Sequence, residues 1–458
     1  MHPYLVIAIN FLMSLSLLIV LHELGHFIPA RLFKTRVEKF YLFFDIKYSL
    51  FKKQIGETIY GIGWLPLGGY VKISGMIDES MDKEQMAQEP KDWEFRSKPA
   101  WQRLIIMLGG VFVNVVVGFV IYICLISFNG TNNAQGDDFK YGFGFPETLE
   151  EVGFVQGDKI LLLDKDTIAY APSLNHRFIF RDVKTVTVLR DSEHVVVSIP
   201  EDMGSRIFEA GVKSSLEPRF PFTAGNIKKG SKADRIGMQA GSKILSVAGH
   251  PINYNTDYSY AINHKVTHGE PFQVVWEYKG TQYEKETAFS TVEKTTFSFF
   301  TKTVDEPKIL GFTKKPTDPT YQTVERRQYT LSESISEGIS QGYWTMHDYI
   351  VQFKYVFTAK GASQLGGFGT IAKLYPDTFD WTAFWATTAF ISFILAIMNI
   401  LPIPALDGGH VMFLLYEIIT GRKPGDAFLE RAQITGIIIL LSLMLYANGN
   451  DLFKALFG

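Results

Sequence analysis

The sequence predicts a multi-pass α-helical membrane protein with four spanning helices and a β-rich insert between the second and third helix. Three observations support this: four apolar runs near the two ends of the chain, strand-forming stretches between them, and a length of 458 residues, which suggests two to four domains. The formal net charge is −2 and no basic stripe is present, so we expect no nucleic-acid partner. The single cysteine, Cys124, excludes an intrachain disulfide and a cysteine-based zinc site.

The apolar runs cover residues 5–21, 104–127, 381–401 and 434–447. A spanning helix needs roughly 17–25 apolar residues, so the fourth run reaches that length only with its flanks. The first run has the alternative of a cleaved signal peptide, but no Lys or Arg precedes it and no small-residue cleavage site follows it. We therefore expect the spanning helices within the following parts of the chain: residues 1–30, 104–127, 376–410 and 411–458.

Basic residues near the spans predict how the chain crosses the bilayer. Residues 31–103 contain thirteen Lys and Arg, the loop between the third and fourth runs contains Arg422, Lys423 and Arg431, and the tail before Leu5 contains none. Because short loops rich in Lys and Arg stay in the cytoplasm, we expect both loops inside and both termini outside. The insert then also lies outside.

The insert contains strand-forming stretches at residues 185–189, 194–199 and 272–278, and an internal repeat. Residues 152–161 and 236–245 share a Gly, a second Gly four residues later, and Lys-Ile-Leu after one further residue. Residues 224–252 resemble a PDZ domain, and residues around 140–220 match more weakly. We expect a tandem PDZ insert, divided as follows: a PDZ-like domain at 128–221, a PDZ domain at 222–310, and a linker with amphipathic helices at 311–375.

The end of the first apolar run carries His22-Glu23-Leu24-Gly25-His26. On a helix, residues four apart lie on one face, so both imidazoles can bind one metal ion while Glu23 reaches a water on that metal. Zinc accepts imidazole nitrogen and keeps a position open for water, whose proton a carboxylate then takes during attack on a peptide carbonyl. A chance match on a helix is the alternative, but ionisable residues at a membrane span are costly and usually functional.

A hydrolytic zinc site needs a third protein ligand, and none follows His26 directly. Asp407 is the strongest candidate, because Pro402 and Pro404 break the third span just before it. Irregular backbone at membrane depth is tolerated only where it is buried in protein or lines a cavity. His410 is a competing candidate, which we interpret instead as a histidine near the metal or at the membrane interface.

These motifs resemble the site-2 protease family of intramembrane zinc metalloproteases, of the bacterial RseP type. The resemblance covers nearly the whole chain: His-Glu-Leu-Gly-His in the first span, Asn399-x-x-Pro-x-Pro-x-Leu-Asp407-Gly in the third, and the outer insert. It implies His22, His26 and Asp407 as zinc ligands and Glu23 as catalytic base. It also implies that Asn399 helps to hold the substrate, although a hydrogen bond between helices is the alternative for that residue.

Two stretches depart from the family pattern. Residues 109–114 have Val111 where the family often has proline, and residues 366–373 begin Gly-Gly-Phe where Ser-Gly-Pro is common. Both lie outside the expected ligand set, and they bear on local backbone shape and substrate preference.

Residues 60–75, within the 31–103 region, are similar to the family's membrane-reentrant β-loop. They alternate glycine with large apolar residues and are too short to span. An open strand edge there can bind an unwound substrate through backbone hydrogen bonds, which gives the expected substrate-binding residues: Gly68, Gly69, Tyr70 and Val71. The alternative is an ordinary hairpin packed on the bundle. The complete expected fold therefore includes a membrane-associated β-hairpin loop.

The resemblance implies an endopeptidase of the bacterial inner membrane that cuts single-pass membrane proteins, such as anti-sigma-type regulators, after a site-1-type protease has cut them outside. Remnant signal peptides are further expected substrates. The insert would exclude bulky substrates, capture new C-termini, or act only as a structural plug. A catalytically silent scaffold that holds partners through the PDZ pair is the alternative function, and the complete His-His-Asp and Glu set argues against it. A membrane-tethered zincin acting on outer proteins conflicts with the expected orientation, because the metal motif falls at the cytoplasmic end of the first span.

Overall fold

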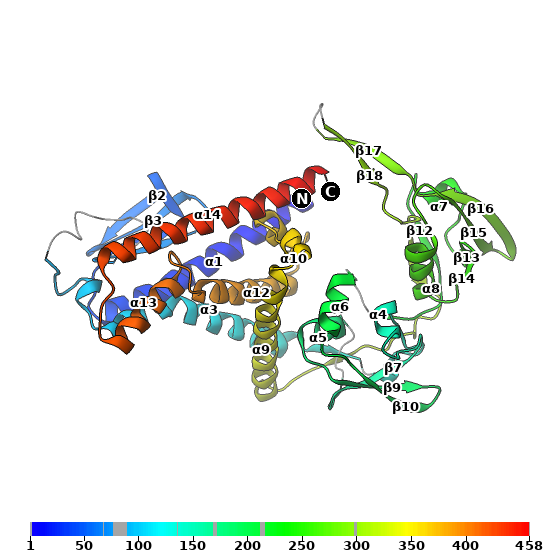
Figure 1. The fold of residues 1–458 in the computed structure, drawn as a ribbon, viewed down its shortest axis with the longest axis horizontal. Coiled ribbons are helices and arrows are strands. Elements are labelled where there is room, and N and C mark those ends of the chain that lie inside the picture. The colour runs from blue at the N-terminus through cyan, green and yellow to red at the C-terminus, as the bar shows by residue number, and fades with distance from the viewer. Residues whose placement is uncertain are drawn as a thin grey trace. The chain divides into compact units, whose positions relative to one another are not determined.

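A computed structural model describes residues 2–66, 68–76, 89–134, 136–167, 172–210, 216–296 and 300–457. The chain forms two compact units. The helical unit comprises Met1–Gly130 and Gln328–Leu452, and the insert unit comprises Thr131–Arg327 with Phe453–Gly458. Figure 1 shows the long helices of the first unit and the small sheets of the second.

Within the described residues, four helices are long and apolar enough to cross a membrane: α1 (Pro3–Leu32), α3 (Ala100–Asn129), α12 (Trp381–Ile400) and α14 (Asp426–Phe457). The four expected helices are therefore present. A helix of 20 residues is about 30 Å long, close to the thickness of the hydrocarbon core. The fourth spanning helix, α14, has 32 residues and is much longer than its apolar run, because the polar residues on both sides of the run are helical too.

The helical unit also contains further helices: η1 (Phe95–Ser97), α9 (Leu331–Val356), α10 (Ala359–Gln364), α11 (Phe368–Ala372) and α13 (Asp407–Thr420). The separate helix α13 differs from the expected division at residue 410, because the chain resumes a helix directly after the break. It ends at Thr420 and is followed by Gly421, whose φ of 67° is the left-handed conformation common after a helix. The buried Arg103 holds α3 to α13 through a 2.5 Å contact with Glu417.

Glycines let the helices of this unit approach closely. A Cβ on Gly25 of α1 would lie 2.3 Å from the carbonyl oxygen of Gly109 in α3, so the two backbones touch there. Helix α9 packs on α3 in the same way, since a Cβ on Gly338 would lie 2.6 Å from Ile123. Each contact requires glycine, because a Cβ cannot approach another heavy atom to these distances.

A four-stranded sheet of order β2-β3-β1-β4 follows α1. Its strands are β1 (Val37–Leu42), β2 (Phe44–Ile55), β3 (Thr58–Leu65) and β4 (Tyr70–Ile73). Strands β2 and β3 form an antiparallel hairpin that begins before the expected loop at 60–75, and β1 runs parallel to β3 and extends it into a sheet. The strands within 60–75, β3 and β4, do not pair with each other, because β1 lies between them. Strand β4 pairs with β1 and forms one edge. Apolar side chains on β2 are more than half exposed: Ile46, Tyr48, Leu50, Phe51 and Ile55.

The insert unit contains two small domains, joined to the helical unit by β5 (Thr131–Asn133) and β20 (Glu325–Arg327), which pair with each other. The first domain has these strands: β6 (Phe143–Gly144), β7 (Lys159–Leu163), β8 (Asp166–Thr167), β9 (Thr185–Arg190), β10 (Glu193–Ser198) and β11 (Glu217–Pro218). Its helices are η2 (Gly136–Asp138), α4 (Glu147–Glu150), α5 (Pro172–Phe180) and α6 (Met203–Ala210).

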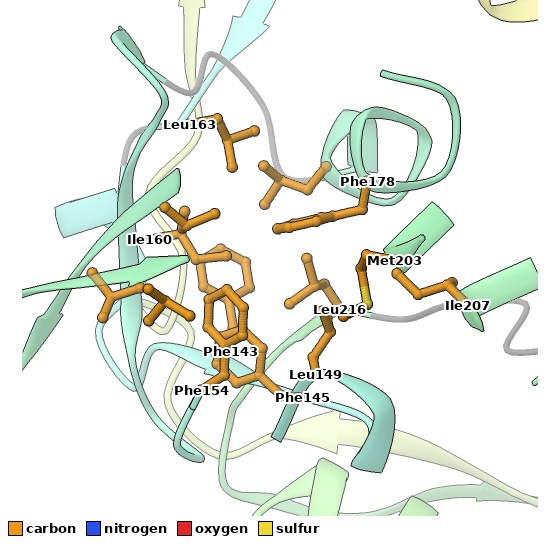
Figure 2. Close-up of a cluster of buried hydrophobic side chains, with 14 of the residues drawn as sticks. Phe143, Phe145, Leu149, Phe154, Ile160, Leu163, Phe178, Met203, Ile207 and Leu216 are labelled. Atoms are coloured by element: carbon orange, nitrogen blue, oxygen red, sulfur yellow. The ribbon is translucent and has the colours of Figure 1, made fainter. Parts of the chain in front are cut away.

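Figure 2 shows the core of the first domain, where side chains from its strands and helices converge. The rings of Phe145 and Phe154 stack with centroids 4.7 Å apart. Ile160 from the repeated Lys-Ile-Leu and Ile207 of α6 are fully buried in the same cluster. The apolar residues of the repeat therefore form the center of this small domain.

The second domain has these strands: β12 (Phe222–Ile227), β13 (Lys243–Val247), β14 (His250–Pro251), β15 (Pro271–Tyr278), β16 (Thr281–Ala288), β17 (Thr291–Thr296), β18 (Phe300–Asp305) and β19 (Phe312–Pro316). Its helices are α7 (Lys232–Arg235), α8 (Asn255–Tyr260) and η3 (Ala261–Lys265). The domain extends past the expected end at residue 310, because β19 pairs with β12.

The two small domains share one topology, which explains the sequence repeat. Their sheets have the same order, β8-β7-β9-β10 in the first and β14-β13-β15-β16 in the second, so the repeated Lys-Ile-Leu begins an equivalent strand in each. The repeated glycines also match: Gly153 and Gly157 have φ of 108° and 99°, and Gly237 and Gly241 have 79° and 93°. Those backbone angles favour glycine. The assignment of both domains as PDZ domains stays a prediction.

Candidate metal centre

Helix α1 places His22, Glu23 and His26 on the inner side of the helical unit. Glu23 and His26 expose 9% and 7% of their surface, so these polar groups are buried inside an apolar bundle. The close approach at Gly25 brings α3 against this turn of α1. Gly110 of α3 then makes room for both imidazoles, because a Cβ there would lie 2.4 Å from His26 Nε2 and 2.6 Å from His22 Cε1.

Asp407 reaches this turn from the other end of the chain. Helix α12 ends at Ile400, residues 401–406 form an irregular loop, and Asp407 begins α13. The loop folds back tightly, since a Cβ on Gly408 would lie 2.2 Å from the Leu401 carbonyl oxygen. Ala405 in this loop has a φ of 81°, a left-handed conformation that costs an ordinary residue about 1–2 kcal/mol. The break expected from the prolines is thus present.

Three ligand atoms form a nearly equilateral triangle. His22 Nε2 lies 3.2 Å from His26 Nε2 and 3.3 Å from Asp407 Oδ2, and His26 Nε2 lies 3.4 Å from the same oxygen. Bonds of about 2.0–2.2 Å to a tetrahedral zinc ion place ligand atoms roughly 3.3–3.6 Å apart, so the triangle has the right size. Asp407 Oδ2 is buried and makes no hydrogen bond, as expected of an oxygen that serves as a ligand. Among the described residues this group of three could hold a metal ion.

The other nitrogen of each imidazole is held by α3. His26 Nδ1 lies 2.8 Å from the Ile106 carbonyl oxygen, so Nδ1 carries the proton and Nε2 is free for a metal. His22 Nδ1 lies 3.2 Å from the side-chain amide of the fully buried Asn114, whose oxygen has no hydrogen-bond partner. Turning that amide over lets its oxygen accept the His22 Nδ1–H, which satisfies both groups.

Asn114 is a site residue that the sequence analysis leaves without a role. Its position inside the apolar run of the second span is the feature that could have identified it, because polar residues within a span are costly. Its backbone oxygen accepts a hydrogen bond from Ser392 Oγ of α12 at 2.7 Å. This contact fixes α3 and α12 relative to each other beside His22.

The remaining predicted site residues lie at different distances from the triangle. The amide nitrogen of Asn399 lies 3.3 Å from His22 Nε2, so α12 places this side chain at the metal group. The Val71 backbone amide hydrogen-bonds the Glu23 carboxylate, and a Cβ on Gly69 would lie 3.5 Å from Glu23 Cγ. Gly68 instead faces the ring of Phe44.

A cavity of about 660 Å³ adjoins the triangle and separates it from the sheet. Tyr70 and Val71 of β4 line it, and Tyr70 donates a 2.8 Å hydrogen bond to Asp45 Oδ1 on β2. His410 lines it too but is not part of the three-residue metal group. The arrangement places two imidazoles, one ligating carboxylate and a second carboxylate beside a space that can admit a peptide and water.

Comparison with known proteins agrees with this site. The family model of peptidase family M50 matches residues 10–443, so the chain belongs to this family, that of the site-2 proteases. The chain is 27% identical to the regulator of sigma-E protease RseP of Escherichia coli, over 96% of this chain and 97% of that protein. It is 24% identical to a "putative zinc metalloprotease" of Neisseria meningitidis, over 97% of this chain and 98% of that protein.

A second "putative zinc metalloprotease", from Campylobacter jejuni, is 26% identical, over 96% of this chain and 91% of that protein. Family, relatives and helices together define the class of the protein: it is a zinc metalloprotease of the intramembrane type and an integral membrane protein.

Proposed function

We propose that His22, His26 and Asp407 bind the zinc ion and that Glu23 is the catalytic base for peptide hydrolysis within the bilayer. The ligand triangle carries this proposal, since three donor atoms from opposite ends of the chain meet at the edge lengths that tetrahedral zinc requires. When bound, zinc polarises the scissile carbonyl and lowers the pKa of a water to about 7. The Glu23 carboxylate lies beside the ligand triangle without being part of it, so it is available to move the proton.

Glu23 takes the proton of the attacking water and delivers it to the leaving amide nitrogen. The hydrogen bond from the Val71 amide fixes one side of its carboxylate, so the carboxylate stays aimed at the cavity. Asn399 donates its amide N–H to the substrate backbone at the reacting peptide bond. Its distance of 3.3 Å from His22 Nε2 supports this role, because the substrate carbonyl must lie in the same space.

The substrate adds to the edge of β4 as an extra strand. A transmembrane helix must unwind before its peptide bonds can reach the zinc, and an open strand edge can bind the unwound backbone. Among the described strands β4 pairs with β1 alone and is the last strand of its sheet, and its residues Tyr70 and Val71 line the cavity. The exposed apolar side chains of β2 support membrane immersion of this sheet, because water is a poor environment for so many of them.

Replacing Val71 by proline tests the contact between this strand edge and the Glu23 carboxylate. The Val71 N–H points away from β1, toward Glu23, so proline removes an outward donor without breaking the β1–β4 pairing. We expect kcat/KM to fall at least about 10-fold, as for loss of a hydrogen bond to a charged group. Val71→Ala is the matched control and should keep near-normal activity. Equal activity of the two variants, measured on one detergent-solubilised substrate, would exclude a role for the hydrogen bond between Val71 and Glu23.

The substrates are single-pass membrane proteins of the bacterial inner membrane, such as anti-sigma-type regulators, and remnant signal peptides. A site-1-type protease cuts the regulators first on the outer side. The two domains of the insert unit act as PDZ domains on that side, with both chain termini, and exclude substrates whose outer part is still bulky. The basic segments 31–103 and 422–431 support this orientation.

Two matched substrates test this assignment in liposomes that contain the full chain. Both carry the same tagged transmembrane segment; one has a short outer stub and the other a folded outer domain. We expect cleavage of the stub substrate only, with product ends that map inside the segment by mass spectrometry. Cuts outside the segment would contradict intramembrane cleavage, and equal rates on both substrates would contradict the size filter. Zinc binding without cleavage of either would favour the scaffold alternative.

A further inference from the structure

Helix α14 buries one polar side chain, that of Gln433, although several apolar side chains of the same helix are exposed. Gln433 exposes 4% of its surface, whereas the apolar residues Ile438, Leu441 and Leu445 of the same helix expose 59%, 49% and 71%. A buried polar side chain needs a hydrogen-bond partner, because an unsatisfied amide inside a helix bundle costs free energy. The Oε1 atom of Gln433 accepts a 3.1 Å hydrogen bond from the backbone N–H of Ala405.

The partner lies in the strained loop that carries the third ligand. Ala405 has a φ of 81° and precedes Asp407 by two residues. A non-glycine residue keeps a left-handed conformation only where its surroundings hold it there. The donor is a backbone N–H, so the Gln433 atom that faces it must be the amide oxygen, and the amide orientation is fixed.

A second contact between α14 and this loop is independent of the hydrogen bond. A Cβ on Gly436 would lie 1.6 Å from the Pro404 carbonyl oxygen, so the backbone of α14 touches the loop one turn after Gln433. The helix therefore holds both Pro404 and Ala405. Gln433 also lines the cavity at the metal group, together with Leu406 and Asp407.

We propose that Gln433 is a positioning residue that holds the Asp407 carboxylate in the ligand triangle through the Ala405 backbone. This inference rests on the proposed zinc site. Without the hydrogen bond, Ala405 relaxes toward a negative φ and the carboxylate two residues later turns away from the imidazoles. Zinc is then left with two protein ligands that are still in place on α1.

Cobalt(II) binding to the detergent-solubilised full chain, after removal of metal by a chelator, tests the proposal. Cobalt takes the zinc geometry, and its visible absorption reports the ligands and their arrangement. Gln433→Met keeps the side-chain volume but has no amide oxygen. We expect its cobalt affinity to be about 10–100-fold below that of the wild type, which is the usual effect of removing a residue that orients a metal ligand. We also expect its visible spectrum to change. Gln341→Met, at an exposed position of α9, is the control and should match the wild type.

A rescue variant separates positioning from a general loss of structure. Glycine adopts a left-handed φ without strain, so Ala405→Gly should restore much of the cobalt affinity and spectrum to Gln433→Met. If the methionine variant is not recovered from membranes, Gln433→Asn, one methylene too short to reach Ala405, should show the same loss and the same rescue. Wild-type cobalt affinity and spectrum in Gln433→Met, or no rescue by Ala405→Gly, would overturn the inference alone. Absence of cobalt binding by the wild type would overturn the zinc site as well.

Discussion

Glu23→Gln is expected to abolish peptide hydrolysis while zinc remains bound. The glutamine has the shape of the glutamate, but it cannot accept a proton from the attacking water. General-base catalysis contributes about 10²–10⁴-fold to the rate, so kcat should fall by at least about 100-fold with little change in KM. The ligand triangle does not include Glu23, so the zinc content should match the wild type.

The measurement combines single-turnover cleavage of a tagged span with metal analysis of the same preparation. Glu57→Gln is the matched control, because Glu57 is exposed in the turn between β2 and β3 and far in sequence from the ligands. It should cleave normally. Cleavage by Glu23→Gln at more than a tenth of the wild-type rate would show that another group takes the proton.

Asp407→Ala is expected to remove zinc and activity together. The carboxylate supplies one corner of the triangle, and two imidazoles from one helix turn leave two coordination positions to water. Loss of a supporting residue near a metal costs about 10–100-fold in affinity, and loss of a ligand should exceed that range. After dialysis against a weak chelator, we expect less than one tenth of the wild-type zinc content.

The matched control for this variant is Asp426→Asn, an exposed carboxylate at the start of α14. It changes the charge in the same part of the chain and should keep its zinc. Zinc retained by Asp407→Ala at wild-type occupancy would mean that a different group, with His410 the nearest in sequence, supplies the third bond.

Short sequence motifs predicted those parts of the site whose geometry depends only on neighbouring residues. The spacing of His22 and His26 determines their common face wherever a helix forms, and the prolines before Asp407 indicate the break that frees it. The length of the fourth span could not be predicted, because its apolar run covers only 14 residues, 434–447. The helix itself continues through the polar residues on both sides of that run.

Contacts between distant segments could not be predicted in this way. Asn114 is a single polar residue in an apolar run, and Gln433 directly precedes one. Nothing local indicates that the first contacts His22 and the second contacts Ala405. The expected hairpin at 60–75 is opened by β1, which comes earlier in the chain and pairs with both β3 and β4, and no local pattern indicates that insertion. Helix α13 was not predicted as a separate helix, because the expected division at residue 410 joined its first residues to the third span. Its Gly408 and Gly409 pack tightly against the loop before it.

The ligands of the proposed zinc site lie at residues 22, 26 and 407, so nearly the whole chain must be synthesised and inserted before the ion can be held. During biogenesis the nascent protein would carry its two histidines in the bilayer while the aspartate is still on the ribosome. Neighbouring spans that leave the translocon at that stage would meet an inert helix. At the proposed site, a chain that is still being synthesised would lack the third ligand and therefore the complete metal group.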